Sequence, residues 1–233
     1  MKVTFRRCIF VLIVAFLLFL TFEALITDYF SWDLTISEWG QSKDVGSVAE
    51  YDNRMGVAGA AGVLGIIIIA LLWFKGWRAE AAFVGLVGIA DLINPLLREV
   101  IARPRPDGDL ITICRESTDF SFPSGTAMHV VMFSGFLIYL SGRLLKPGWI
   151  RTALQVILGL WIPIMGTWLI YRGVHWPSDV LGGYVYGAVF LWMIIWGFKK
   201  YITWRRAFPR DRLPREELPS TIRPLAWALR LVY

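Results

Sequence analysis

The chain has 233 residues, of which 56% are hydrophobic and only 18% are charged, and it carries a formal net charge of +6 at pH 7. A soluble domain of this size would have about 25% charged residues, so this composition excludes an ordinary soluble globular protein. The hydrophobic residues also gather in long blocks, which is typical of a membrane protein.

Six apolar blocks follow one another along the chain, at residues 8–26, 56–74, 79–97, 124–145, 150–171 and 178–198. About 20 apolar residues cross a hydrocarbon core as a helix, and lipid leaves no other partner for the backbone groups of an isolated span. The first block is longer than a signal-peptide core and lacks a small-x-small cleavage site, so we expect an uncleaved helix. We predict an all-α integral membrane protein with a six-helix domain at 1–198 and a basic cytoplasmic tail at 199–233.

The distribution of Lys and Arg predicts that both termini are cytoplasmic. In that orientation 17 of the 24 Lys and Arg residues lie on the inner side and the other seven on the outer side. The net positive charge therefore reflects membrane orientation and does not indicate a nucleic-acid partner. The end of the tail, residues 220–233, reads either as an amphipathic helix lying on anionic lipid or as a disordered basic segment.

The third helix is predicted to end at the outer face with Arg98, and the stiff sequence Arg-Pro-Arg-Pro follows at 103–106. Arginines such as Arg98 and Arg105, held on a proline-restricted frame, can grip a phosphate bidentately. Arginines at a helix end can also extend to lipid headgroups, and this segment alone favours that simpler interpretation.

The fourth helix is predicted to begin at the sequence Ser-Phe-Pro-Ser-Gly-Thr-Ala-Met-His, residues 121–129. Ser124 can cap this helix, and the backbone N–H groups that follow it, at Gly125 and Thr126, can bind an anion. An ordinary helix cap is the alternative. His129 lies three residues beyond Thr126 on nearly the same face, and a histidine in a membrane helix indicates a functional role or a partner within the bundle.

The sixth helix is predicted to begin at His-Trp-Pro-Ser-Asp, which places His175 and Asp179 four residues apart. A carboxylate at that spacing can hold one imidazole nitrogen and leave the other as a base or nucleophile. The alternative is a capping aspartate beside an interfacial histidine.

Taken together and in this order, the three segments resemble the signature of the type 2 phosphatidic acid phosphatase family, which includes lipid phosphate phosphatases and vanadium haloperoxidases. Arg98 and Arg105 fall on the Lys and Arg of its first motif, residues 123–125 on the Pro-Ser-Gly of the second, and His175 and Asp179 on the third. The resemblance implies that His175 attacks phosphorus and forms a phosphohistidine, that Asp179 orients it, and that the cations and the Ser-Gly backbone hold the phosphoryl oxygens. It also implies that neither a metal nor a cofactor is required.

The chain departs from the family pattern at two functional positions, besides having Arg98 in place of a lysine. Thr126 stands where the family has its general-acid histidine, and Trp168 and Leu169 stand where it has Ser-Arg. His129 and Arg172 lie one helical turn away from these positions, about 5 Å, and we predict them as substitutes. We therefore assign catalytic roles to His175, Asp179 and His129, and assign phosphate binding to a set of six residues, Arg98, Arg105, Ser124, Gly125, Thr126 and Arg172.

These features predict a metal-independent lipid phosphate phosphatase or phosphotransferase whose site faces the outside of a bacterial inner membrane. The expected substrates are phosphatidic acid, phosphatidylglycerol phosphate or a polyprenyl diphosphate, and membrane lipids are the other expected partners. A relative that binds or moves a lipid phosphate without hydrolysing it is the alternative, favoured by Thr126 and Leu169. The retained pair His175–Asp179 argues against that alternative, because binding alone needs no nucleophile.

Overall fold

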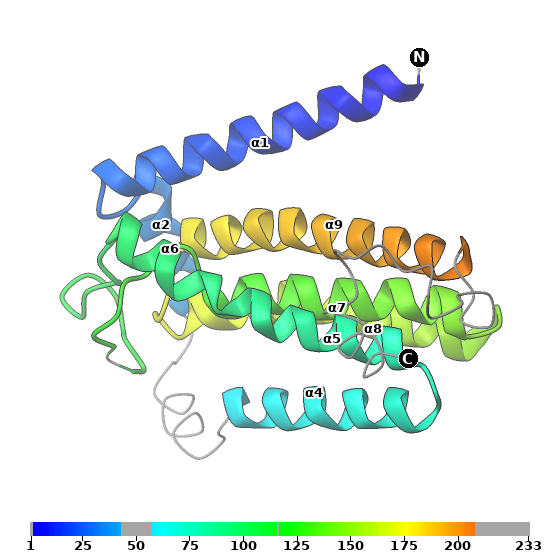
Figure 1. Cartoon of the computed structure of the whole chain (residues 1–233). Helices are drawn as coiled ribbons and strands as arrows, with labels where there is room; N and C mark the ends of the chain where they lie inside the picture. Colours follow the sequence, from blue (N-terminus) through cyan, green and yellow to red (C-terminus); the bar gives the residue numbers. More distant parts are fainter. Residues whose placement is uncertain (1, 43–56, 116, 208–233) are drawn as a thin grey trace.

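The protein is described here from a computed structural model, which covers residues 2–42, 57–115 and 117–207. Within those ranges the chain is helical with no strand, as Figure 1 shows. The helices are α1 (Lys2–Ile26), α2 (Ser31–Gln41), α4 (Val57–Phe74), α5 (Arg78–Asp91), α6 (Ile93–Ile101), α7 (Gly125–Leu144), α8 (Trp149–Tyr171) and α9 (Pro177–Ala207). The predicted all-α class is thereby confirmed.

Each predicted apolar block lies along a helix, and the third block is shared by α5 and α6. Four helical segments are long and apolar enough to cross a membrane, namely Arg78–Ile101, α7, α8 and α9. The pair Val11–Ile26 and α2 forms a fifth if its 89° bend lies within one span, and the apolar segment Gly62–Phe74 of α4 is shorter. The chain is thus an integral membrane protein, whereas the number of six spans stays a prediction.

The break between α5 and α6 follows from a proline. In an unbroken helix the N–H of residue 95 would donate to the carbonyl of Asp91, but Pro95 has no N–H and its ring crowds that carbonyl. The helix therefore ends at Asp91 and resumes at Ile93. This break lies beside Asn94 and Arg98, which both face the start of α7.

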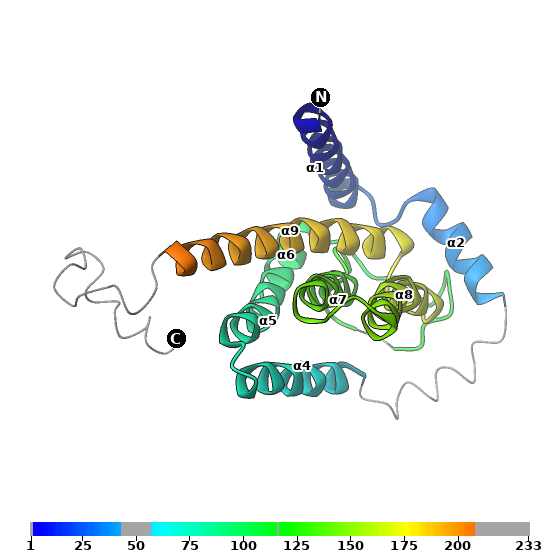
Figure 2. The same ribbon diagram turned by 90° about the vertical axis from the view of Figure 1, so that its right-hand side faces the viewer.

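Helix α7 lies at the centre of the bundle, between α5, α8 and α9 (Figure 2). Its buried residues Met132 and Phe136 pack against Val87 of α5 and Phe198 of α9. The glycines of α9 let that helix approach closely. A Cβ added to Gly183 would come within 2.5 Å of the Ser124 carbonyl oxygen, and only a missing side chain permits this contact.

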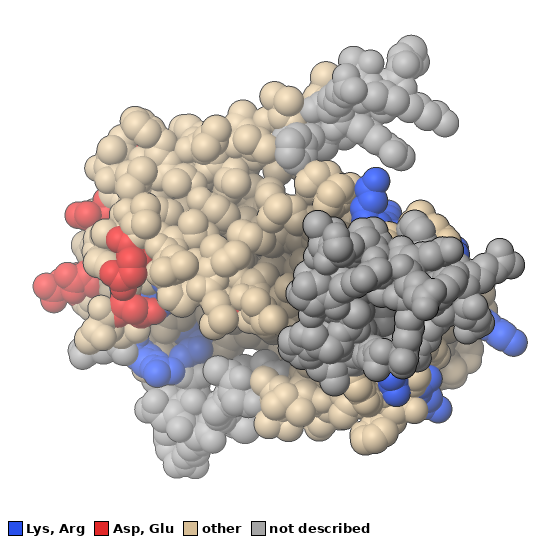
Figure 3. Space-filling model, viewed as in Figure 1, with Lys and Arg blue, Asp and Glu red and all other residues tan. Residues whose placement is uncertain are grey.

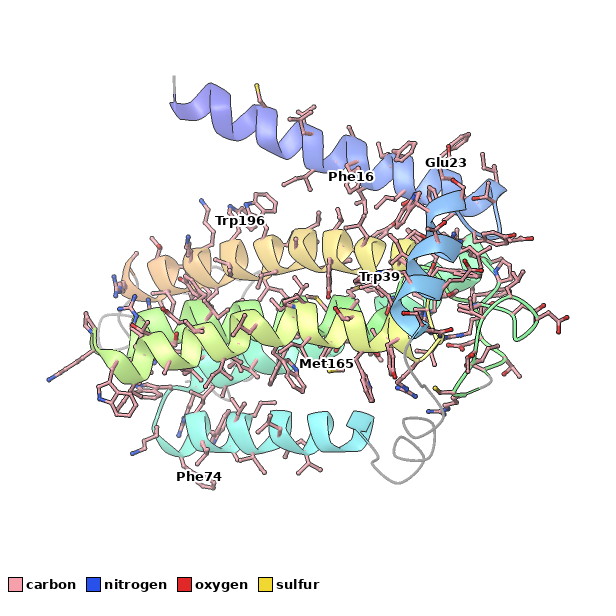
Figure 4. All side chains as sticks on the ribbon, turned by 180° about the vertical axis from the view of Figure 1, so that it is seen from behind. Phe16, Glu23, Trp39, Phe74, Met165 and Trp196 are labelled. Carbon is pink, nitrogen blue, oxygen red and sulfur yellow. The ribbon has the colours of Figure 1, made fainter. Side chains whose placement is uncertain are left out.

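Helix α2 runs across one end of the bundle and contacts α8 and α9 (Figure 4). Although α2 lies in a polar stretch between the first two apolar blocks, its residues Asp33 and Ser37 are fully buried. The reason is tertiary, because polar partners from distant parts of the chain meet Asp33 there. Helix α1 contacts the bundle through Leu20 and Ala24 near its end.

The two ends of the molecule differ in charge. In Figure 1 the N-terminus and the end of α9 lie at one end, and α2 with the loop 102–124 lies at the other. On the face in Figure 3, acidic side chains appear only at the end that holds α2 and this loop. Helix α9 continues unbroken through residues 199–207 of the predicted tail. The rest of that tail, including the predicted interfacial helix, lies outside the described residues.

Candidate active site

The three predicted segments meet at one end of the bundle. They are the loop 102–124, the start of α7 and the turn between α8 and α9. Backbone hydrogen bonds join them, because the N–H of Ser124 donates to the Asp179 carbonyl (3.0 Å) and the N–H of Cys114 donates to the Arg172 carbonyl (3.0 Å). A single polar site is therefore built from parts of the chain that are far apart in sequence.

The Pro-Ser-Gly turn presents the positive end of α7. Ser124 caps the helix by accepting a hydrogen bond from the N–H of Ala127 (3.4 Å). The N–H groups of the first helical turn, at Gly125 and Thr126, have no partner within the helix and carry the partial positive charge of its dipole. A Cβ on Gly125 would lie 2.6 Å from the Asn94 side-chain oxygen, so this position requires glycine. The turn can therefore bind an anion.

His175 is buried in the segment that joins α8 to α9, with 3% of its surface exposed. Its Nδ1 lies 3.7 Å from Oδ2 of Asp179 and 3.4 Å from Oγ of Ser121. Burial lowers the pKa of His175 below its ordinary 6.5, and the nearby carboxylate of Asp179 opposes this shift without reversing it. The imidazole is thus neutral at pH 7, and Nε2 is the nitrogen directed away from the Asp179 carboxylate.

Asp179 is fully buried and held from several sides. Its Oδ2 accepts hydrogen bonds from the N–H of Trp176 (2.8 Å) and from the hydroxyl of Ser121, and its Oδ1 accepts one from Nη1 of Arg103 (2.7 Å). Each of these groups is a donor, which fits an ionised carboxylate. The orientation of Asp179 toward His175 is therefore fixed by its surroundings.

Arg98 and Arg105 lie near the same turn and share one counter-ion. Nε of Arg98 donates to the Pro123 carbonyl (3.2 Å), and Nη1 of Arg105 donates to the Val174 carbonyl, next to His175. Both guanidinium groups also form ion pairs with Asp119. Burial would raise the pKa of Asp119, but the hydroxyl of Ser117 and the two arginines outweigh it, so the pKa is lowered and this carboxylate stays ionised.

The predicted substitutes for the missing residues are placed differently from each other. His129 has its Nδ1 2.5 Å from Oδ2 of Asp91 and stacks on Phe133, one turn deeper in α7 than the exposed Thr126. Arg172 is buried at the end of α8, with its guanidinium carbon 6.0 Å from the centre of the Trp168 ring.

The position of the missing family arginine is filled by an apolar contact. Leu169 is buried against Ala127 and Val180, so a leucine here helps to pack α8 against α7 and α9.

Several site residues were missed by sequence reasoning. They are Asp33, Arg103, Asp119, Ser121 and Ser178. Of these residues, Arg103 could have been noticed from the sequence, because it is the first arginine of the Arg-Pro-Arg-Pro segment that contains Arg105. Asp33 has no such signal, since it lies 70 residues before Arg103 in an acidic stretch that resembles a surface loop. Within residues 2–42, 57–115 and 117–207 there is no cluster of His, Cys, Asp or Glu that could hold a metal ion.

Comparisons with known proteins agree with the motif pattern. Residues 79–203 match the model of the PAP2 superfamily. A curated protein, phosphatidylglycerophosphatase B of Bacillus subtilis (strain 168), is 34% identical over 119 residues, which is 49% of this chain and 55% of that protein. The match thus spans about half the length of the curated relative.

A solved structure is also similar. It is described as the first transmembrane PAP2 type phosphatidylglycerolphosphate phosphatase from Bacillus subtilis. The TM-score is 0.69 at 27% sequence identity, and the likeness covers 82% of this chain and 96% of that chain. The arrangement of the helices is therefore shared over most of both proteins.

Proposed function

This chain belongs to the PAP2 superfamily, and from that premise we propose that it is an integral membrane phosphatase acting on lipid phosphates. The observation that carries the proposal is the position of His175, whose Nδ1 faces Asp179 and Ser121 beside the capped start of α7. A buried, neutral imidazole oriented by a carboxylate and adjacent to anion-binding groups is equipped for nucleophilic attack on phosphorus. The names of the two relatives favour phosphatidylglycerol phosphate among the expected substrates.

In the proposed reaction Nε2 of His175 forms a bond to phosphorus while the bond from phosphorus to the lipid oxygen breaks. The electron pair of the broken bond stays on that oxygen, which takes a proton from a general acid. Water then forms a bond to phosphorus while the bond from phosphorus to Nε2 breaks, and the electron pair of that bond returns to a neutral imidazole. The proton lost by the water restores the general acid. Arg98, Arg105 and the N–H groups at the start of α7 stabilise the charge on the phosphoryl oxygens.

His129 is the proposed general acid in place of Thr126. Asp91 supports this role, because its Oδ2 lies 2.5 Å from Nδ1 of His129 and holds the ring in one orientation. His129 lies one turn further along α7 than Thr126. Arg172 is the proposed additional cation, supported by its burial three residues before His175.

The test measures phosphate release from dioctanoyl phosphatidic acid, phosphatidylglycerol phosphate and a polyprenyl diphosphate in detergent. His175→Ala should reduce release to background, and His129→Gln should lower kcat by about a hundredfold or more, the usual cost of losing a general acid. Lys146→Gln, at the opposite end of the bundle, is the control and should match the wild type. Equal release by the wild type and His175→Ala would contradict the catalytic assignment.

A second candidate function is the binding or movement of a lipid phosphate without hydrolysis. The apolar burial of Leu169 favours it, because this position lacks the cation that the family signature places there. Under this alternative no lipid in the panel releases phosphate, while vesicles containing phosphatidic acid still bind the protein.

A further inference from the structure

A buried ionic cluster lies behind His175 and Asp179, and its centre is Arg103. The side chains of Arg103, Asp33 and Asp179 are all fully buried. Arg103 bridges the two carboxylates, with Nη1 2.7 Å from Oδ1 of Asp179 and Nη2 3.1 Å from Oδ2 of Asp33. Its Nη1 also donates to Ser178, and its Nε donates to the carbonyl of Asp28. The family motif assigns phosphate binding to Arg105. Arg103, two residues earlier, binds a different set of partners.

The hydrogen bonds indicate that both carboxylates in the cluster are ionised. Asp33 accepts from the N–H groups of Phe30 (2.9 Å) and Ser178 (2.8 Å), from the Ser178 hydroxyl (2.6 Å) and from Arg103. Asp179 likewise accepts only from donors. The backbone N–H groups and Arg103 can only donate, so they favour the ionised form of both carboxylates, and a protonated carboxyl could donate only to a serine hydroxyl. The cluster therefore holds two negative charges and one positive charge.

A positive charge on His175 would offset the excess negative charge directly at Asp179. An uncompensated buried charge is costly, and a cationic imidazole beside Asp179 would balance it. Bond formation from Nε2 of His175 to phosphorus, with Nδ1 still carrying its proton, creates that positive charge. Hydrolysis of the nitrogen–phosphorus bond removes it again. The cluster thus stabilises the charged ring of the covalent intermediate more than the neutral ring of the resting enzyme.

The same cluster fixes α2 to the site. Asp33 holds the first turn of α2, and Gln41 holds its last turn by donating to the carbonyls of Thr112 (2.8 Å) and Tyr171 (3.0 Å). Tyr171 ends α8, four residues before His175. The position of the segment that carries His175 therefore depends on both ends of α2.

Resting on the proposed function, we propose that Arg103 and Asp33 are positioning residues that hold Asp179 as a carboxylate against His175 and set the charge balance of the phosphohistidine. Three other charged groups act on His175 directly, namely Asp179 of α9, Arg98 of α6 and Arg105 of the loop 102–124. Asp119 pairs with both of these arginines. The proposal concerns Arg103 and Asp33 because they act on His175 through Asp179.

The two residues have opposite charges, so their removal should shift the pH dependence in opposite directions. Activity requires neutral His175, so kcat/KM rises with pH through the pKa of that ring. Arg103→Gln removes a positive charge, favours the protonated ring and should move the acid limb to higher pH. Asp33→Asn removes a negative charge and should move the limb to lower pH, each by about half a unit or more. A variant that only loosens the fold would not produce shifts of opposite sign.

The experiment measures pH profiles of phosphate release from dioctanoyl phosphatidic acid by the full chain in detergent. Arg103→Gln and Asp33→Asn should each lower kcat at least tenfold with KM changed less than threefold, and Arg103→Lys should recover part of the lost kcat. The double variant Arg103→Gln/Asp33→Asn restores the charge balance, so its acid limb should return toward the wild-type position. Arg115→Gln, at an exposed arginine of the same loop, is the control.

Shifts of the same sign, or unchanged profiles and kcat in both single variants, would overturn the proposal. If Arg103→Gln does not fold, the sign of the Asp33→Asn shift and the recovery in Arg103→Lys decide the question. If the wild type and His175→Ala release phosphate equally, the proposed function itself has failed. If the wild type depends on His175 but the Arg103 and Asp33 variants behave like the wild type, only the proposal for Arg103 and Asp33 has failed.

Discussion

At the scale of single residues, Asp119 has the most direct consequence for substrate binding. Its carboxylate pairs with Arg98 and Arg105, the two cations proposed to hold a phosphate. A phosphate and a carboxylate seek the same donors from a guanidinium, so the lipid phosphate must compete with Asp119. The lowered pKa of Asp119 keeps this competitor ionised through the neutral range.

Asp119→Asn is therefore expected to lower KM for dioctanoyl phosphatidic acid. Asp119 is about half exposed, so each ion pair is screened by water and contributes only about 0.2–1 kcal/mol. Loss of both pairs corresponds to a fall in KM of about twofold to thirtyfold, with kcat little changed. Initial-rate kinetics at low ionic strength measure the effect. Asp109→Asn, at an exposed carboxylate of the same loop, should leave KM unchanged, and an increase in KM for Asp119→Asn would show that Asp119 assists binding.

Some residues of the candidate site can be found from short sequence patterns, and others meet only through tertiary contacts. His175 and Asp179 are four residues apart in one segment, and Ser124 precedes its own helix, so short sequence patterns reveal them. Asp33 and Arg103 meet only because α2 folds across the end of the bundle. No spacing rule in one sequence encodes such a contact, which is why the cluster behind Asp179 could not be predicted.

At the scale of helices, hydrophobicity alone predicts most of the fold. The six apolar blocks lie along helices because lipid-facing and core-facing residues are both apolar in a membrane bundle. A search for long apolar blocks does not find helix α2, because it is polar and only 11 residues long. The break before Pro95 follows from a missing N–H group, but its consequence, the placement of Arg98 beside Pro123, depends on the packing of α6 against the loop.

The packing of α9 against α7 predicts a strong effect of a single methyl group. A Cβ at Gly183 would lie 2.5 Å from the Ser124 carbonyl oxygen and 2.9 Å from the Ala127 Cβ. Gly183→Ala should therefore separate α9, which carries Asp179, from the anion-binding turn. Overpacking of this kind costs about 1–3 kcal/mol, and we expect a lower Tm in detergent together with a loss of activity of at least tenfold.

Gly88 of α5 offers a matched control, because it is exposed and a Cβ there would meet nothing within 4 Å. Gly88→Ala should keep full activity and raise the stability slightly, since alanine has a higher helix propensity than glycine by about 1 kcal/mol. If Gly183→Ala behaved like Gly88→Ala and kept the wild-type Tm and activity, α9 would not approach α7 as closely as the structure places it.

At the scale of the whole molecule, the distribution of charge predicts how the bundle is oriented across the membrane. Arg143, Lys146 and Arg151 lie around the turn between α7 and α8, at the end where α9 also finishes. The candidate site lies at the other end, with α2 and the loop 102–124. By the positive-inside rule we expect the turn between α7 and α8 to face the cytoplasm and the site to face outward. A lipid phosphate would then be hydrolysed at the outer leaflet.

This orientation predicts which positions an impermeant thiol reagent can reach in intact bacterial cells that produce the protein. In a background with Cys8→Ser and Cys114→Ser, a cysteine introduced by Asp109→Cys lies in the loop beside the site and should be labelled from outside. Lys146→Cys, in the turn between α7 and α8, should be labelled only after the membrane is permeabilised. Both positions are exposed, so a difference in labelling reports the membrane barrier rather than burial. Labelling of Lys146→Cys but not Asp109→Cys in intact cells would place the site in the cytoplasm, and the substrate would then have to come from the inner leaflet.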